Sequence, residues 1–376
     1  MTDTRKIQRY YAEFFPFQFV LRLLSHDNQP LWKTSNREIS LTVVTPSRTF
    51  VHRFNSVANE AEWRELLMRY PTFVQIDVGG VYPKPAELTN RLRGEAKLAE
   101  FVVQRELQFD IDLTDYDADV RYCCKGKKCC AKCWRLAYAA ARVLDAFLRD
   151  SMRFQSVLWF YSGRRGVHCW VCDNDIGKAR DWMRANLADY IADQTKHLRT
   201  ATADLSVFFR NNIIERELFP LFRLVVEEQQ LFRVDERREK FFTGWDFPPQ
   251  ILQEWTKATN FGVDSLRDTI NNFRSTPSLR RYVEKRPYLY EEVVLRCLHP
   301  RIDREVTTDM AHLIKVPFSL HPATGVPCLA MTLEEMASFD PERAITVDTC
   351  TKEHIEQSVR TALELLRKPD VEQHQQ

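Results

Sequence analysis

The sequence predicts an α/β fold of the mixed α+β kind, into which a helical region is inserted. Short stretches of alternating apolar residues, typical of strands, occur among helical patterns in the first 174 residues and again near residue 315. From residue 175 to residue 287 the apolar spacing is helical. A chain of 376 residues is too long for one ordinary core. We therefore expect two domains, or one domain that carries a large insertion.

Composition restricts the class of protein. The 54 basic and 52 acidic residues give a net charge of +2, which excludes a strongly basic, histone-like protein, so any nucleic-acid surface must be a local patch. No apolar run reaches the roughly 18 residues that span a bilayer, and residues 1–6 lack the apolar stretch of a secretory signal. We expect a soluble, intracellular protein with no membrane contact. Its ten cysteines should be thiols or metal ligands instead of disulfides.

Local patterns predict the elements of the first 80 residues. In chain order these are a helix in the aromatic-rich segment before Pro16, a hairpin of strands at 37–45 and 49–54, a helix at 59–69 and a strand at 72–78. The last strand carries Asp77. We expect it to end at Gly79 and Gly80, because glycines commonly mark turns.

An acidic strand pattern follows at residues 106–117. Its buried face would carry four apolar side chains, Leu107, Phe109, Ile111 and Leu113. Asp110 and Asp112 then share the other face. Because residues two apart on a strand lie only about 7 Å apart, the two carboxylates can bind one cation or a pair of cations, as in a polymerase that holds magnesium. The alternative is a solvated strand face that happens to carry two acids.

Five cysteines lie within eleven residues, at Cys123, Cys124, Cys129, Cys130 and Cys133. The Cys130-x-x-Cys133 spacing is typical of a metal knuckle, and the Cys123-Cys124 pair offers further thiolates. Since so many exposed thiols would invite oxidation, we expect a structural zinc site, for which five candidates compete for four places. The alternative is a set of free thiols. A helix from Trp134 to Arg149 should follow, with a core stripe of Leu136, Ala140, Val143, Leu144 and Phe147.

A glycine-flanked turn at 163–166 joins two expected strands, 157–162 and 167–172. The turn carries Arg164 and Arg165, with Ser162 just before it and His168 just after it. Glycines let a backbone approach a ligand closely, and paired arginines supply bidentate donors that match phosphate oxygens. The alternative is a pair of idle arginines at an exposed hairpin tip.

Helical spacing continues to residue 287. After a cap at Asn174 or Asp175, it is kept by Ile176, Ala179, Trp182, Met183, Leu187, Tyr190 and Ile191. Further helical stretches are expected at 205–224, 251–255 and 266–273, and the alternating charges of 235–240 indicate a solvated helix face.

The C-terminal part begins with a helix from Pro287 to Cys297 that stops at His299 and Pro300. Taken alone, Asp303, Lys315 and His321 are unremarkable polar residues near an apolar strand. A last helix at 352–367 precedes a polar tail that we expect to be disordered.

Four motifs, at 106–116, 123–133, 162–172 and 312–321, resemble in this order the small catalytic subunit of eukaryotic-type DNA primase, within the archaeo-eukaryotic primase superfamily. The resemblance runs from Tyr10 to Pro322, and the string Ser-Gly-Arg-Arg-Gly-Val-His after a cysteine knuckle is highly specific. It implies a primase-polymerase catalytic core with a zinc knuckle and an inserted helical domain. The implied parts are the first part of the core at 1–174 with the zinc motif at 123–133, the helical insertion at 175–287, the second part of the core at 288–368 and a disordered tail at 369–376.

The resemblance also implies a role for individual positions. The catalytic residues would be Asp110, Asp112 and Asp303, which match aspartates that hold two Mg²⁺ or Mn²⁺ ions. The nucleotide-binding residues would be Ser162, Arg164, Arg165, His168, Lys315 and His321 at the triphosphate, and Arg37 and Asp77 near the incoming sugar. Zn²⁺ would be held by Cys123, Cys124, Cys130 and Cys133, which leaves Cys129 as an extra thiol. The sequence departs from the family at Gln75, where a lysine is common, and in a short helical region and tail.

The function implied is that of a DNA-dependent RNA polymerase, a nucleotidyltransferase that makes short RNA primers de novo from ribonucleoside triphosphates on a single-stranded DNA template. The implied partners are a large primase subunit and the replicative DNA polymerase alpha complex, and the implied location is the nucleus. Two other functions remain open. One is a primer-extending primase-polymerase that prefers deoxynucleotides. The other is a zinc-stabilised, non-catalytic nucleic-acid-binding module in which Lys125, Lys127, Lys128 and Lys132 bind phosphates.

Overall fold

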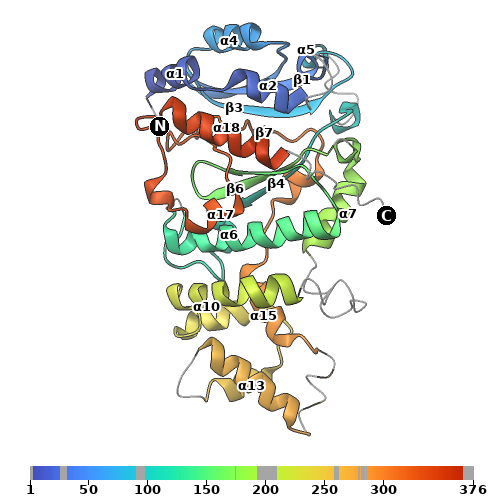
Figure 1. Cartoon of the computed structure of the whole chain (residues 1–376), viewed down its shortest axis with the longest axis vertical. Helices are drawn as coiled ribbons and strands as arrows, with labels where there is room; N and C mark the ends of the chain where they lie inside the picture. Colours follow the sequence, from blue (N-terminus) through green and yellow to red (C-terminus); the bar gives the residue numbers. More distant parts are fainter. Residues whose placement is uncertain are drawn as a thin grey trace, which may run out of the picture.

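The computed structural model describes residues 3–25, 32–89, 98–126, 128–173, 175–192, 210–257, 262–277, 280, 284 and 286–366. Two antiparallel sheets occupy the upper part of an elongated molecule, and a group of helices forms its lower end (Figure 1). The predicted mixed α/β class is therefore confirmed. Predictions for Asn174, Lys127, residues 193–209 and the tail concern residues outside these ranges.

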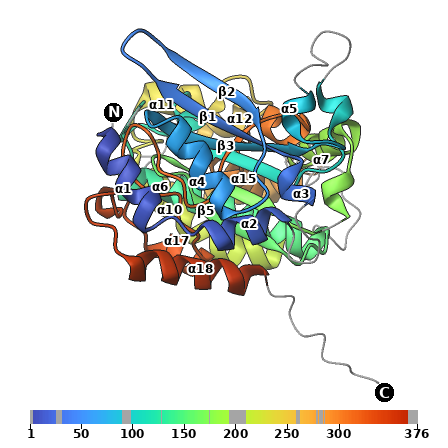
Figure 2. The same cartoon turned by 90° about the horizontal axis from the view of Figure 1, so that it is seen from above.

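The first sheet has four strands in the order β2-β1-β3-β7, which are β2 (Thr49–Asn55), β1 (Arg37–Val44), β3 (Phe73–Val81) and β7 (Ile314–Lys315). The predicted hairpin is β1 and β2, which project at one edge of the molecule (Figure 2). The predicted end of β3 is wrong, because the strand continues through Gly79 and Gly80. A Cβ atom on Gly80 would lie 2.3 Å from Cγ1 of Val102, so this glycine permits close packing and does not end the strand.

The second sheet has three strands in the order β4-β6-β5, which are β4 (Leu107–Asp112), β6 (Gly166–Val171) and β5 (Val157–Tyr161). The four apolar side chains predicted to be buried are fully buried, Leu107, Phe109, Ile111 and Leu113. However, the strand ends at Asp112 and not beyond Leu113. The Asp112 carboxylate accepts a hydrogen bond from the Thr114 amide at 2.8 Å, and this cap starts the 3₁₀ turn η3 (Leu113–Tyr116).

Helix α6 (Ala131–Ala146) lies below the second sheet and continues as a π-helical turn, η4 (Phe147–Ser151) (Figure 1). Its predicted core stripe is buried. The opposite face of this sheet shares a second core with the four-stranded sheet. Helices that contribute to this second core are α1 (Thr4–Glu13), α2 (Phe17–Ser25), α4 (Glu60–Arg69) and α18 (Lys352–Leu366). Helix α2 follows Pro16 directly and was not predicted.

The helices of the lower end follow the predicted order, with different starting points. They are η6 (Arg210–Leu218), which is π-helical, α10 (Phe219–Glu228), α11 (Asp235–Phe242), α12 (Pro249–Trp255), α13 (Val263–Ser275) and α15 (Leu289–Leu298). Helix α15 ends at Leu298, and His299 follows it as the C-cap, as predicted. The charged face of α11 is not wholly solvated, because Arg238 is buried and donates a hydrogen bond to the Phe232 carbonyl at 2.8 Å. The predicted domain boundaries stay predictions.

Helix α7 (Asp181–Ala192) packs beside α16 (Arg304–Thr308). It begins at Asp181, after a separate 3₁₀ turn, η5 (Ile176–Lys178), and not at the predicted cap. Two residues of its apolar spacing lie outside the core, since Trp182 is 66% exposed and Met183 is 45% exposed. Helix α7 buries the face that carries Arg184, Ala188 and Ile191. The apolar spacing predicted a helix but did not show which of its faces would be buried.

The remaining short elements are α3 (Trp32–Ser35), α5 (Ala86–Thr89), η2 (Leu98–Phe101), α17 (Leu333–Ser338) and η7 (Pro341–Arg343). Among the helices that the structure describes, none combines the length and the apolar character needed to cross a membrane.

Candidate active site and cysteine cluster

Asp110 and Asp112 lie at the end of β4, on the face opposite the α6 core. Strand β6 runs antiparallel to β4, so that Asp110 is opposite His168 and Asp112 is opposite Gly166. The preceding pair on this face, Gln108 and Trp170, is fully buried, whereas the carboxylates are 32% and 35% exposed. Along this face of β4 and β6, burial therefore decreases from the core toward the two aspartates, whose carboxylates are accessible.

Asp110 carries a strongly perturbed carboxyl group. Burial raises its pKa to about 7, and the negative charges of Asp112 and Asp303 act in the same direction. The positive charge of Lys315 opposes this rise without cancelling it. The negative charge that gathers here is incompletely neutralised by the protein.

Asp112 behaves in the opposite way. Burial raises its pKa, but hydrogen bonds from Arg165 and Thr114 outweigh burial and bring the pKa below its ordinary value. The Nε atom of Arg165 lies 2.7 and 2.9 Å from the two carboxylate oxygens of Asp112. Only Nε makes this contact, so the terminal nitrogens of the Arg165 fork are not used by Asp112.

Asp303 joins the pair from almost 200 residues further along the chain. Its amide donates a hydrogen bond to the Asp110 carbonyl at 2.9 Å, and Ile302 forms an isolated antiparallel bridge with Ile111. The exposed Asp303 side chain caps α16, accepting from the Glu305 amide at 2.9 Å. We call Asp110, Asp112 and Asp303 the acid site.

The acid site offers ligands of the kind that divalent cations require. Carboxylate oxygens are preferred by Mg²⁺ and Mn²⁺. In this structure the Asp112 carboxylate is held by Arg165, and the Asp303 carboxylate by the start of α16. The raised pKa of Asp110 is the observation that fits a cation, because a positive ion would offset both the cost of burying the carboxylate and its repulsion by Asp112 and Asp303.

Basic and uncharged donors face the acid site. Lys315 on β7 donates from Nζ to the Ser162 carbonyl at 2.8 Å, and burial lowers its pKa. Burial lowers the pKa of His168 to about 3, aided by the positive charge of Lys315. Burial lowers the pKa of His321 to about 3 as well, aided by Lys315 and Arg164. Both imidazoles are therefore neutral at pH 7.

His168 lies near Asp110, but the two side chains form neither a hydrogen bond nor an ion pair. Its Nε2 atom lies 3.7 Å from Oδ1 of Asp110, which is too long for a hydrogen bond and is no ion pair when the ring is uncharged. Its Nδ1 atom is buried and has no hydrogen-bond partner in the described part of the chain. Such an atom is expected to have a partner when a ligand is bound.

The turn at 162–166, which we call the arginine hairpin, is held by its own backbone and by the loop that carries His321. Ser162 accepts a hydrogen bond through Oγ from the Gly166 amide at 3.1 Å. Gly163 has a φ of +86°, and a Cβ atom there would lie 2.8 Å from Cβ of His321. Thr324 donates from Oγ1 to the Gly163 carbonyl at 2.7 Å. Glycine is therefore required at 163 for both conformation and space.

Asp77 and Gln75 lie next to this group on β3. Asp77 is opposite Lys315 in the pairing of β3 with β7, and burial raises its pKa to about 6. Nε2 of Gln75 donates to the Asp77 carboxylate at 2.7 Å. The residue that departs from the family pattern thus contacts a predicted nucleotide-binding residue directly.

Arg37 lies apart from this group in a closed environment. It is 1% exposed and forms an ion pair with Glu106, which is also 1% exposed. A second contact joins its guanidinium to the Leu24 carbonyl at 3.2 Å. Its predicted role near the sugar stays a prediction, and the contacts in this structure are internal.

The structure brings four sulfur atoms together, those of Cys123, Cys124, Cys130 and Cys133, all within 4.8 Å of one another. We call these four residues the cysteine cluster. Two neighbouring sulfur pairs, Cys130 with Cys123 and Cys130 with Cys133, are 3.7 and 3.9 Å apart. Four sulfurs about 2.3 Å from a tetrahedral zinc ion lie about 3.8 Å apart, so these two spacings fit a zinc site. Cys129 is close but outside this set, with its sulfur 3.8 Å from that of Cys133.

The cysteine cluster is supported by a residue that the sequence did not indicate. Gln229, at the end of α10, is fully buried and accepts from the Tyr122 and Cys123 amides at 2.7 and 2.9 Å. Its Nε2 atom lies 3.2 Å from the Cys123 sulfur. The only available signal was a pair of glutamines, Gln229 and Gln230, in an otherwise charged and apolar stretch, and nothing in the sequence singles out the first of them.

A stack of aromatic rings connects the cysteine cluster to the arginine hairpin. Trp134 directly follows Cys133, and its ring meets that of Tyr161 edge to face at a centroid distance of 5.4 Å. The Tyr161 hydroxyl donates to the Arg164 carbonyl at 2.9 Å. Phe339 closes the stack, with its centroid 4.9 Å from both rings. The cysteine cluster and the arginine hairpin are thus connected by a continuous series of packing contacts and one hydrogen bond.

Comparison with known proteins supplies an independent identification. Residues 109–332 match the family model described as DNA primase small subunit. The chain is 32% identical over 360 residues to the DNA primase small subunit of Drosophila melanogaster, covering 90% of this chain and 78% of that protein. It is 30% identical over 353 residues to the one from Saccharomyces cerevisiae, covering 90% of this chain and 82% of that protein. The chain belongs to the DNA primase small subunit family.

Proposed function

We propose that the protein is the catalytic subunit of a DNA primase, which joins ribonucleotides de novo into short RNA primers on single-stranded DNA. The observation that carries the proposal is the meeting of three carboxylates with Arg164, Arg165, Lys315 and two neutral histidines at the end of one strand pair. Family membership supports the same activity.

In this proposal the acid site holds two divalent ions, Mg²⁺ or Mn²⁺. When bound, these ions activate the attacking 3′-hydroxyl and stabilise the leaving pyrophosphate. Asp110 must lose its proton to bind a cation. Since its pKa is raised to about 7, that proton is easily displaced near neutral pH.

The basic side chains would bind the nucleotide triphosphate. Arg165 can keep Nε on Asp112 while its terminal nitrogens contact phosphate oxygens, which would tie the nucleotide to the acid site. Lys315 adds a positive charge beside Ser162. His168 and His321, being neutral, would donate through ring N–H groups and add no charge. Arg37 and Asp77 are assigned to the sugar end of the nucleotide.

The cysteine cluster would hold one structural Zn²⁺ ion. Four thiolates complete a tetrahedral shell and leave no open position for chemistry. The ion would stabilise the start of α6 and, through Trp134 and Tyr161, the backbone of the arginine hairpin. Its role in catalysis would be indirect.

The partners proposed are a single-stranded DNA template, ribonucleoside triphosphates, a large primase subunit and the replicative DNA polymerase alpha complex in the nucleus. The names of the two relatives support a large subunit, since each is called a small subunit. The near-neutral net charge does not conflict with this proposal, because the template pairs with the incoming nucleotide and the protein needs little base readout of its own.

The test is synthesis on a bare single-stranded template with no primer, with either ribonucleotides or deoxynucleotides and with Mg²⁺ or Mn²⁺. We expect short RNA products that disappear when Asp110 and Asp112 are replaced by Asn. Products from deoxynucleotides only, and only on supplied primers, would support a primer-extending polymerase instead. DNA binding without synthesis by the wild-type chain, alone and with a large subunit, would favour the non-catalytic module.

A further inference from the structure

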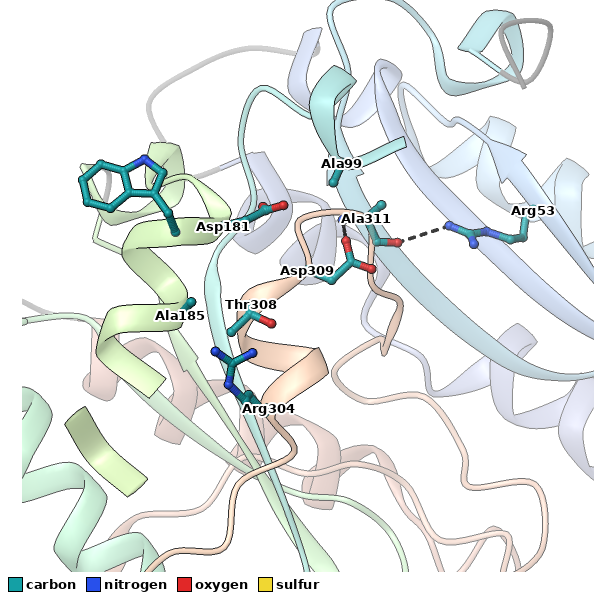
Figure 3. A pocket seen from close by; sticks show the side chains of 9 residues that line it. Arg53, Ala99, Asp181, Ala185, Arg304, Thr308, Asp309 and Ala311 are labelled. Carbon is teal, nitrogen blue, oxygen red and sulfur yellow. Dashed lines mark hydrogen bonds between the residues drawn. The ribbon is translucent and has the colours of Figure 1, made fainter. Parts of the chain in front are cut away.

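A groove lies between α7, α16, β2 and η2 (Figure 3), and none of the predicted catalytic, nucleotide-binding or zinc-binding residues lines it. Its cavity volume is about 650 Å³, which is in the range of sites that enclose small organic groups. Arg304 and Thr308 line it from α16, Trp182 from α7 and Arg53 from β2. We call it the α7–α16 groove.

The groove begins directly beside the acid site. Arg304 is the residue after Asp303, and consecutive Cα atoms lie about 3.8 Å apart. The Asp303 amide is bonded to the Asp110 carbonyl, so α16 is fixed to β4 at one end and lines the groove along its length. The groove and the acid site are therefore neighbours at the start of α16.

Trp182 is the unusual residue of the groove. Its side chain is 66% exposed, whereas Trp63, Trp134, Trp159, Trp170 and Trp255 are almost fully buried. An exposed indole face gives up the hydrophobic stabilisation that burial would provide. Aromatic faces beside basic residues bind single-stranded nucleic acids by stacking on bases.

The charges of the groove distinguish a nucleic acid from an apolar protein partner. Arg304 is paired with Asp189 at 3.0 Å, but both side chains are more than half exposed, so this pair is weak and the guanidinium can turn to a phosphate. Arg53 is held more firmly by the buried Glu38 and is a fixed positive charge. Asp181 and Asp309 also line the groove, so it suits a stacked base with one or two phosphates and not a long run of backbone.

We propose that the α7–α16 groove binds the single-stranded DNA template beside the acid site, with Trp182 stacking on a base and Arg304 contacting a phosphate. The inference rests on the proposed function for the identity of the strand, because the template is the nucleic acid present before the first bond is formed. It adds a binding surface outside the acid site, the arginine hairpin and the cysteine cluster.

The test is equilibrium binding of a fluorescein-labelled oligothymidylate, measured by anisotropy without nucleotides. We expect Trp182→Ala to weaken binding at least about fivefold, and Trp182→Phe to keep most of the affinity. Arg304→Ala should weaken binding and reduce the slope of log affinity against log salt by about 0.7, the loss of one phosphate contact on a single strand.

Two variants are matched controls. Met68→Ala removes an apolar side chain that is 72% exposed on α4, away from the groove. Arg223→Ala removes an arginine that is 52% exposed and paired with Asp264, much as Arg304 is paired with Asp189. Both should bind DNA like the wild type. Melting temperatures close to that of the wild type would show that all five variants are folded.

The outcomes separate this inference from the proposed function. If the wild type makes primers but Trp182→Ala and Arg304→Ala bind the oligonucleotide normally, the groove is not a template site. If these variants lose only the association with a large subunit, the groove is a protein interface and the inference is overturned. If the variants lose DNA binding while the wild type makes no RNA, the groove stands as a site for single-stranded DNA, but the polymerase proposal fails and the strand is not a template.

Discussion

The acid site and the cysteine cluster are built in opposite ways. The cluster comes from eleven consecutive residues, and its four sulfur atoms already lie within 4.8 Å of one another. The acid site needs two strands, a distant cap and a hairpin, and the pKa of Asp110 is raised to about 7 by burial and, next to it, by the negative charges of Asp112 and Asp303. The cluster is arranged to close around an ion, whereas the acid site keeps charge unneutralised. We infer that the first serves the fold and the second serves the reaction.

The largest effect should come from the acid site. Asp112→Asn should lower primer synthesis by several orders of magnitude while the protein stays folded, since the lost charge acts on the transition state. Initial rates at saturating template and nucleotide would measure the loss. Glu65→Gln, which removes an exposed acid on α4, is the charge-matched control and should keep wild-type activity. Normal synthesis by a folded Asp112→Asn protein would end the assignment.

Next in size should be the arginine hairpin. Arg165→Ala should lower kcat/KM for the nucleotide by a factor that corresponds to about 2 to 4 kcal/mol. Arg165→Lys should also be damaging, because an ammonium is a single point charge and cannot replace a planar fork that keeps Nε on Asp112 while two terminal nitrogens contact phosphate oxygens. We expect KM to rise and kcat to fall. Steady-state kinetics with nucleotide varied at saturating template give both constants. Arg9→Ala, which removes an exposed arginine on α1, is the control. If Arg165→Ala and Arg9→Ala have the same kcat and KM, Arg165 does not bind the nucleotide.

The difference between the two regions also explains what the sequence could predict. Local information was enough where the chain contacts itself nearby: the alternation of β4, the stripe of α6 and the grouping of cysteines all appear in the structure as expected. The resemblance to primases was needed for Asp303 and Lys315, because nothing local marks a residue that reaches the site from a distant part of the chain.

The failures have the same cause. Gly79 and Gly80 suggest a turn by their conformational freedom, yet Gly80 is needed because Val102 packs against it. The spacing that includes Trp182 is correct for a helix but does not say which neighbour covers which face. Gln229 supports the cysteine cluster from 106 residues away. Each depends on tertiary contacts that periodicity does not contain.

A third prediction concerns the cysteine cluster. Cys133→Ser should remove bound zinc and lower the free energy of unfolding by about 3 kcal/mol, as expected when a structural metal is lost. Metal analysis and denaturant unfolding measure the two effects. Cys129→Ser is the matched control, since its sulfur lies near Cys133 but outside the cluster, and it should change neither. An unchanged zinc content in Cys133→Ser would show that the ion is held elsewhere.

The smallest expected effect is on the pH dependence of stability. Replacing Asp110 and replacing Asp112 should change the free energy of unfolding in opposite directions, which tests directly whether the acid site keeps unneutralised charge. The pKa of Asp110 is raised from 3.8 to about 7, so the folded state holds its proton more tightly than the unfolded state. Stability is then lost as pH rises from about 4 to about 7 and stays constant above that range. Asp110→Asn should remove this loss and make the protein more stable at pH 8. The shift corresponds to about 4 kcal/mol, but a carboxylate 32% exposed is screened by water, and we expect about 1 to 2 kcal/mol.

Asp112→Asn should do the opposite, because hydrogen bonds hold the pKa of Asp112 below its ordinary value and its charged form stabilises the fold above that value. Denaturant unfolding at pH 5 and pH 8, without added magnesium, would compare both variants with the wild type. Added Mg²⁺ should then reduce the advantage of Asp110→Asn, since the ion binds the native wild type and stabilises it by mass action. An Asp110→Asn protein that is less stable than the wild type at pH 8, with no effect of Mg²⁺, would show that the charge at the acid site is already neutralised within the fold.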